Sequence, residues 1–151
     1  SAHAKVAVLF IDVDDFKFIN DRFGHSVGDE VIKYVAGCIK QRVKGSGFAG
    51  RFGGDEFVLC ITDAKQIEEI ESLSLDLIDE LYEGYHSELA NVSINVKASI
   101  GIAFFPEHGD DSNKIVAAAD EAMYFVKKNG KANYHIYQPE DSQIEDLQHT
   151  L

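Results

Sequence analysis

Two adjacent glycines, at positions 53 and 54, constrain the fold of this chain more than any other feature. Strand-like runs flank them, at residues 48–52 and 56–61, and Gly53-Gly54-Asp55 joins the two runs. Glycine readily adopts the positive φ angles of tight hairpin turns, so the pattern predicts two neighbouring antiparallel strands. Glycine also lets a backbone approach a ligand closely, which makes Asp55 and Glu56 candidate functional residues. An ordinary hairpin with solvated acids is the structural alternative.

Hydrophobic periodicity predicts the other elements. Further strands are expected at residues 5–12, 93–105 and 134–137, and helices are expected at residues 16–23, 29–44, 67–81 and 115–126. The predicted order is βααββαβαβ. Helices interleaved with hairpin-compatible strands favour the α/β (α+β) class, with a mixed central β-sheet and flanking helices. We expect residues 5–138 to form one domain, and residues 139–151 to be an acidic tail or a linker to a further domain.

The charge balance argues against one class of partner. The chain has 26 acidic and 14 basic residues, which gives a formal net charge of −12. Nucleic-acid polymers bind to basic surfaces that neutralise their phosphates, so we expect no such partner. A nucleotide substrate remains compatible, because carboxylates hold divalent cations and the cations hold phosphates. No apolar run approaches the roughly 20 residues that span a bilayer, so we expect a cytoplasmic domain without membrane contact.

A second acidic site follows the first predicted strand, at Asp12 and Asp14. Strand alternation places both carboxylates on one face, and the ends of strands in open sheets often bind ligands. Two like charges repel each other there unless cations or solvent intervene. A pair of solvated acids is the simpler interpretation of such a short pattern. An EF-hand is excluded, because Phe16 and Lys17 occupy positions that need an oxygen ligand and a glycine.

Five consecutive residues, Gly53-Gly54-Asp55-Glu56-Phe57, are far more specific than a glycine turn alone. Three further segments accompany them, namely IDVDDFKFINDRFGHSVGDE, ASIGIAFFP and DEAMYFVKKNGKANY. Together, from about residue 5 to residue 137, they resemble the GGDEF family of diguanylate cyclases. The resemblance implies a sheet like that of adenylyl cyclases and polymerase palm domains. It also implies condensation of two GTP molecules into cyclic di-GMP, with release of pyrophosphate.

The resemblance further implies a metal site at Asp12, the carbonyl of Val13, Asp55 and Glu56. Mg²⁺ or Mn²⁺ prefers such oxygen ligands and bridges carboxylates to phosphates, and two ions per GTP are expected. Two ions can polarise the α-phosphate, assist deprotonation of the attacking 3′-hydroxyl and neutralise the departing pyrophosphate. By the same resemblance Asp55 or Glu56 helps to take the proton, and Lys127 completes the catalytic set.

Guanine selection falls to Asn20 and Asp29 by the same resemblance. A carboxylate accepts hydrogen bonds from N1–H and the exocyclic amine of guanine, and adenine has neither donor at those positions. The mismatch costs about 1–3 kcal/mol when it is buried. Without the family context, both residues would be interpreted as helix-terminal, with Asp29 as an N-cap.

Phosphate binding is implied at the backbone N–H groups of Phe16 and Lys17, at a helix N-terminus, and at Lys127 and Lys131. Local sequence explains these last two residues equally well as favourable charges in the last turn of a helix. The family usually has arginine at position 131. Lysine lacks the bidentate fork of arginine, so we expect weaker phosphate binding.

An inhibitory product site, Arg-x-x-Asp in many family members, is degenerate here, with Lys44 and Gly47 at its two positions. We therefore expect no product inhibition through that site. The family's N-terminal helix is also missing, and the chain lacks a start methionine, so we expect a piece of a longer protein. That protein would carry a sensory or regulatory domain upstream, a membrane anchor or none, and a phosphodiesterase domain downstream.

One such domain resembles half of an active site, because each 3′-hydroxyl must meet the α-phosphate of the other GTP. The expected partners are therefore GTP and a second GGDEF domain in a transient homodimer. Two other hypotheses stay open. The first is a catalytically silent GTP-binding module that controls an attached domain. The second is a purely structural interaction domain, which would bind no GTP.

Overall fold

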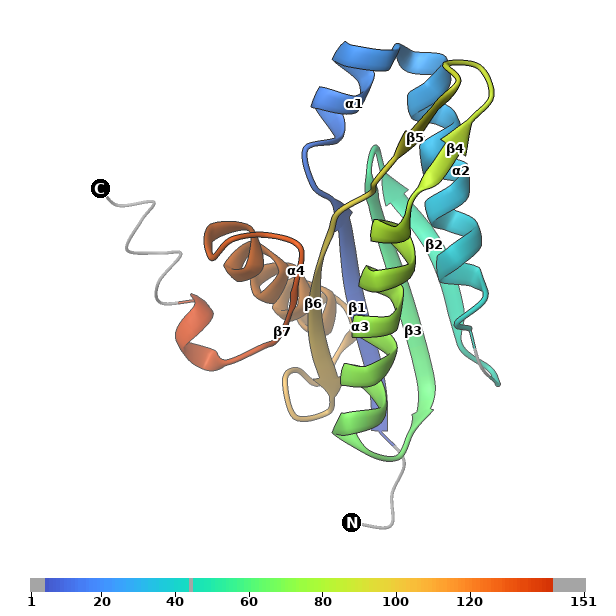
Figure 1. Cartoon of the computed structure of the whole chain (residues 1–151). Coiled ribbons are helices and arrows are strands. Elements are labelled where there is room, and N and C mark those ends of the chain that lie inside the picture. The colour runs from blue at the N-terminus through green and yellow to red at the C-terminus, as the bar shows by residue number, and fades with distance from the viewer. Residues whose placement is uncertain (1–4, 44, 143–151) are drawn as a thin grey trace, which may run out of the picture.

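The computed structural model describes residues 5–43 and 45–142. Figure 1 shows the arrangement of the helices and strands along this part of the chain. The elements are, in chain order, β1 (Lys5–Val13), α1 (Phe16–Phe23), α2 (His25–Lys40), β2 (Phe48–Gly53), β3 (Glu56–Ala64), α3 (Ile67–Glu83), β4 (Tyr85–Ser87), β5 (Val92–Ile94), β6 (Ala98–Phe105), α4 (Ser112–Lys128) and β7 (Tyr134–Ile136).

The central sheet has five strands in the order β2-β3-β1-β6-β7. Its pairs are antiparallel, except that β6 and β7 run parallel. Strand β1 lies in the middle, and alternating residues of β1 enter two different hydrophobic clusters. One cluster joins the sheet to α2 and α3, and the other joins it to α4. Helices therefore cover both faces, as Figure 1 shows, and the predicted mixed sheet with flanking helices is confirmed.

The predicted strand at residues 93–105 is wrong in one respect, because the structure divides it into β5 and β6. Strand β5 pairs with β4, which the periodicity did not predict, in a separate two-stranded sheet. The residues between β5 and β6 are hydrogen-bonded to the end of α3. The Val96 N–H donates to the carbonyl of Leu81 at 3.0 Å, and the Asn95 side chain donates to the carbonyl of Tyr82. These bonds draw the chain away from the central sheet before β6 begins.

Helix α2 begins four residues before the predicted start, at His25. Gly24, at φ 90°, closes α1 by donating to the carbonyl of Asn20, and its own carbonyl accepts from the Gly28 N–H at 3.0 Å. The interpretation of Asp29 as an N-cap is therefore wrong, because Asp29 lies inside α2. The helix also ends at Lys40, so residues 41–43 of the predicted helix are turn and loop.

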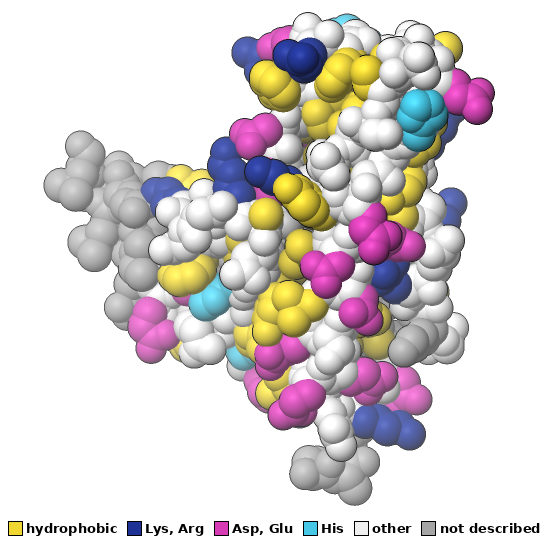
Figure 2. Space-filling view, in the orientation of Figure 1, with side chains coloured by type: hydrophobic (Ala, Val, Ile, Leu, Met, Phe, Trp, Pro, Cys, Tyr) yellow, Lys and Arg dark blue, Asp and Glu magenta, His cyan; other side chains and the backbone are white. Residues whose placement is uncertain are grey.

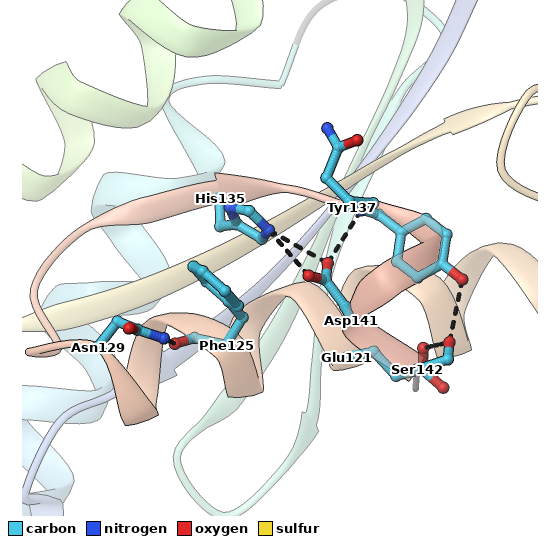
Figure 3. A network of polar contacts seen from close by, with 8 residues as sticks. Glu121, Phe125, Asn129, His135, Tyr137, Asp141 and Ser142 are labelled. Carbon is cyan, nitrogen blue, oxygen red and sulfur yellow. Dashed lines mark hydrogen bonds and ion pairs between the residues drawn. The ribbon is translucent and has the colours of Figure 1, made fainter. Parts of the chain in front are cut away.

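The last described residues contact α4 through a polar network, drawn in Figure 3. His135 Nε2 lies 3.1 Å from a carboxylate oxygen of Asp141, whose other neighbour is the N–H of Gln138 at 2.9 Å. Ser142 contacts the hydroxyl of Tyr137 and the carboxylate of Glu121. Residues 139–142 thus pack against the domain, and residues 143–151 lie outside the described part.

Acidic side chains are spread over the face that α3 covers, as Figure 2 shows. This distribution agrees with the net charge of −12. Within residues 5–43 and 45–142, no helix is long and apolar enough to cross a bilayer.

Candidate functional site

The candidate site begins at the end of β1, where Asp12 and Asp14 converge on a single lysine. The Nζ atom of Lys127 lies 2.7 Å from Oδ1 of Asp14 and 3.1 Å from Oδ2 of Asp12. Lys127 lies in the last turn of α4, so the contact joins that helix to β1. Burial alone would lower the pKa of Lys127, but the hydrogen bond to Asp14 and the charges of both carboxylates raise it above its ordinary value. The two acids predicted to share a face do so, with Lys127 as their shared cation.

Asp14 is buried, and its carboxylate contacts several segments of the chain. Its Oδ1 accepts from the hydroxyl of Ser99 at 2.6 Å, and its Oδ2 accepts from the N–H of Ala132 at 2.9 Å. With Lys127, these contacts connect Asp14 to β6, to α4 and to the loop that follows α4. Sequence reasoning gave neither Ser99 nor Ala132 a role, because nothing in the local pattern relates them to Asp14. The strand pairing that brings Ser99 opposite Asp12 was not predictable from either segment alone.

Asp12 differs from Asp14 because one of its buried oxygens, Oδ1, has no hydrogen-bond partner among the described residues. Burial raises the pKa of Asp12 to about 7; Lys127 opposes this shift, and the nearby charge of Asp55 adds to it. Buried carboxylate oxygens nearly always have partners, so an orphaned one at a strand end is unusual. A cation is a chemically suitable partner for it.

The β2–β3 hairpin brings its acids to the same place. Glu56 pairs with Asp12 in the register of β1 and β3, and the N–H of Val13 donates to the carbonyl of Asp55 at 3.1 Å. Gly54 is left-handed, at φ 51°, and accepts a hydrogen bond from Arg51 at its carbonyl. The turn itself is two residues, Gly54 and Asp55, because Gly53 still pairs with Glu56.

Burial raises the pKa of Glu56, and the charges of Asp120 and Asp55 raise it further. Asp120 comes from α4, and sequence reasoning did not assign it to the site. In the described part of the chain, no three His, Cys, Asp or Glu side chains form a ready-made metal cage. Mg²⁺ commonly uses only one or two protein carboxylates and completes its shell with water and substrate phosphates. The orphaned oxygen of Asp12, with Asp55 and Glu56 close by, fits a cation of that kind.

The two predicted guanine contacts lie on neighbouring helices, Asn20 on α1 and Asp29 on α2. Asn20 is half-buried and Asp29 is exposed. The Asn20 side chain lies directly against Gly28, the residue before Asp29. The structure therefore brings the two residues to one region where α1 and α2 meet.

The predicted phosphate contacts lie around the start of α1. Phe16 and Lys17 are its first two residues, after the left-handed Asp15 at φ 56°. Lys131 lies beyond the end of α4, so its interpretation as a residue of the last helical turn is wrong. Its backbone is left-handed, at φ 61°, and its Nζ lies 2.9 Å from Asp15. That hydrogen bond lowers the pKa of Asp15.

Of the two positions of the degenerate product site, Lys44 lies outside the described residues. Gly47 directly precedes β2 and offers no side chain. The expected loss of this site is therefore still a prediction from the sequence.

The chain matches the family model described as "Diguanylate cyclase, GGDEF domain" over residues 1–133. It is 35% identical over 138 residues to the signaling protein YkoW of Bacillus subtilis, covering 91% of this chain and 17% of YkoW. It is also 35% identical over 133 residues to the diguanylate cyclase DosC of Escherichia coli, covering 87% of this chain and 28% of DosC. The chain thus spans less than a third of the length of these relatives.

Solved structures resemble this one along most of the chain. The GGDEF domain of TpbB (YfiN) from Pseudomonas aeruginosa superimposes with a TM-score of 0.90 at 31% identity, covering 95% of this chain and 83% of that one. The active GGEEF domain of a diguanylate cyclase from Vibrio cholerae gives a TM-score of 0.78 at 28% identity, covering 89% and 84%. These likenesses confirm the fold expected from the sequence motifs.

Proposed function

This chain belongs to the GGDEF family of diguanylate cyclases, and on that basis we propose that it condenses two GTP molecules into cyclic di-GMP and two pyrophosphates. One observation supports the proposal above the others. The buried Asp12 oxygen that has no hydrogen-bond partner within residues 5–43 and 45–142 lies beside the hairpin acids and Lys127, at one end of the sheet. A purely structural hairpin would leave this costly arrangement unexplained, because burying an unpaired carboxylate oxygen is unfavourable.

In the proposed reaction, each domain holds one GTP, and two domains face each other. The 3′-oxygen of one nucleotide forms a bond to the α-phosphorus of the other, while the bond from that phosphorus to the pyrophosphate oxygen breaks. The same exchange in the opposite direction closes the ring. The half-site arrangement explains why a second copy of the domain is required, because one domain cannot place both reacting groups.

The proton of each 3′-hydroxyl needs an acceptor. Asp55 and Glu56 are the candidates, because they lie at the hairpin beside Asp12. The raised pKa of Glu56 moves this carboxylate toward the operating pH, which suits a group that takes up and releases a proton. Both acids belong to the proposed set.

Base selection is proposed for Asn20 and Asp29, and phosphate binding for the start of α1 with Lys127 and Lys131. Lys127 Nζ contacts Asp12 and Asp14, and an ammonium group has a third N–H that can donate to a nucleotide phosphate. Asp12, the carbonyl of Val13, Asp55 and Glu56 would hold Mg²⁺ or Mn²⁺, which would supply Lewis-acid stabilisation of the phosphate charge. A metal bound there would compensate the charge of the Asp12 carboxylate in addition to Lys127.

The test is to fuse the chain to a dimerising coiled coil and incubate it with GTP and Mg²⁺. Several fusions should be made, which differ in how the domain is rotated relative to the coiled coil. Separation of the nucleotides by chromatography should show cyclic di-GMP. The Asp55→Ala variant should make none, whereas Asp63→Ala, at an exposed acid on β3, the strand that follows the turn, should be as active as the parent. If every fusion binds GTP and none forms product, the cyclase proposal is refuted and a silent regulatory module is favoured.

A further inference from the structure

Helices α1 and α2 meet at a very close contact between Asn20 and Gly28. Helix α1 and the start of α2 lie next to each other at one end of the molecule, as Figure 1 shows. A Cβ atom added to Gly28 would lie 1.8 Å from Oδ1 of Asn20 and 3.0 Å from its Cγ. Real Cβ atoms essentially never approach other heavy atoms closer than 3.0 Å. The amide of Asn20 therefore occupies the space that any side chain at position 28 would need.

A second glycine in the same helix provides the comparison. Gly37 also lies inside α2, but a Cβ atom there would meet no atom of the described residues within 4 Å. Glycine weakens a helix relative to alanine at both positions, because it loses more backbone freedom on folding. Lack of space explains glycine at position 28 and does not explain it at position 37. The requirement at position 28 is thus specific to the contact with Asn20.

We propose that Gly28 determines the base specificity of the nucleotide site. Because Gly28 has no side chain, the Asn20 amide can lie against α2, one residue from Asp29. The Asn20 amide and the Asp29 carboxylate then face the same base. The inference rests on the proposed function, because it assumes that Asn20 and Asp29 select guanine. Gly28 itself offers no polar side chain and acts by positioning Asn20.

The geometry indicates that alanine at position 28 would alter this position without unfolding the domain. The nearest atoms to the added Cβ are the end of the Asn20 side chain, which can rotate away. The third nearest is Cζ of Phe16, at 3.3 Å, which needs to shift by only a few tenths of an ångström. No backbone atom is among the three. Gly28→Ala should therefore keep the fold and displace the amide.

The experiment measures binding of 3′-deoxy-GTP and 3′-deoxy-ATP by calorimetry with Mg²⁺, since neither nucleotide has the 3′-hydroxyl needed for condensation. We expect Gly28→Ala to weaken 3′-deoxy-GTP by about tenfold, the loss of one hydrogen bond to the base. Binding of 3′-deoxy-ATP should change little, so the preference for guanine should fall. The matched control, Gly37→Ala, should leave both affinities unchanged. Unchanged binding of 3′-deoxy-GTP by Gly28→Ala would overturn the inference.

A double-mutant cycle with Asn20→Ala tests whether Gly28 acts through Asn20. In the Asn20→Ala background, Gly28→Ala should cause no further loss of 3′-deoxy-GTP affinity, because the displaced amide is already gone. It should also cause no further fall in melting temperature, and the higher helix propensity of alanine should raise it slightly. An equal loss in both backgrounds would overturn the inference. If Gly28→Ala alone does not fold, the double variant should fold, and its failure to do so would also count against the inference.

The two proposals fail in different ways. If the parent protein binds no 3′-deoxy-GTP, the proposed function itself is refuted. If the parent binds the nucleotide and the Gly28→Ala variant binds it equally well, only the role of Gly28 is refuted.

Discussion

The ammonium group of Lys127 lies 2.7 Å from Oδ1 of Asp14, and this ion pair connects the last turn of α4 to the end of β1. Asp14 is almost completely buried, whereas Lys127 retains some exposure. A buried carboxylate is stable only when its charge is compensated, so the pair ties the position of a proposed phosphate contact to the folded core.

Replacing Lys127 with methionine should therefore destabilise the domain. Lys127→Met removes the cation and leaves Asp14 with Ser99 and the N–H of Ala132 as its partners. We expect a loss of about 2 kcal/mol in the free energy of unfolding, measured by urea denaturation. Lys128→Met, at the exposed neighbouring position, is the matched control and should change stability little. Equal effects of the two variants would show that the ion pair contributes nothing.

The raised pKa of Asp12 predicts how stability depends on pH without metal. The folded state binds a proton at Asp12 up to about pH 7, whereas the unfolded carboxyl releases it near 3.8. The unfolded state therefore binds fewer protons in this window, and the contribution of Asp12 to stability falls as pH rises from about 4 to about 7. Asp12→Asn should gain stability relative to the parent protein, more at pH 8 than at pH 5, in urea denaturation with EDTA. A difference for Asp12→Asn that stays constant with pH would contradict the prediction.

Helix α4 packs on β6 so closely that Gly101 has no room for a methyl group. A Cβ atom there would lie 1.9 Å from the carbonyl oxygen of Ala119 and 2.2 Å from the backbone nitrogen of Met123. Backbone atoms cannot rotate away, so Gly101→Ala must displace α4. We expect a loss of about 3 kcal/mol in the free energy of unfolding, seen as a lower melting temperature. Gly37→Ala, which meets open space, should retain or slightly raise the melting temperature.

Lys131→Arg should strengthen nucleotide binding. The side chain of Lys131 lies by Asp15, at the start of α1, where the phosphates are proposed to bind. Arginine offers a planar fork that can hold two phosphate oxygens, whereas lysine is a point charge. We expect the Kd of 3′-deoxy-GTP to fall by about threefold in calorimetry. The control is Lys128→Arg, outside the site, and weaker binding by Lys131→Arg would contradict the proposed contact.

Cyclic di-GMP should not bind tightly outside the active site. Lys44 and Gly47 replace the arginine and aspartate of the family's product site, so the carboxylate and the bidentate fork are both absent. Calorimetry with cyclic di-GMP, in the presence of saturating 3′-deoxy-GTP, should show no high-affinity binding. Restoring both residues with Lys44→Arg and Gly47→Asp should create it. Tight binding to the parent protein would show that another surface recognises the product.

Short-range signals in the sequence predicted most of the elements correctly. The helix expected at residues 16–23 has the bounds of α1, and the hairpin at Gly54 forms as the glycine pattern indicates. Signals of this kind act through the φ and ψ preferences of a few neighbouring residues. The three-residue strands β4 and β5 gave too short a pattern to predict, and their pairing depends on the contacts of Val96 and Asn95 with α3.

The motifs also placed the central residues of the site. Asp12, Glu56 and Lys127 were predicted to act together, and the structure brings them to one end of the sheet. Their metal, base and phosphate roles stay predictions, with the experiments above as their tests. The family resemblance supplied these assignments, because strand alternation and hairpin geometry alone left solvated acids as an equal alternative.

The sequence by itself determined the local elements, the acidic character and the family of this protein. Only the tertiary structure decided which side chains share a contact. Asp14 meets Ser99 across 85 residues of chain and Ala132 across 118, and Asn20 lies against a bare Cα on the next helix. Such contacts depend on strand register and on how closely helices pack, since both are set by the whole core. Local propensity carries no information about them, so the contacts of Asp14 and Gly28 became visible only in the folded domain.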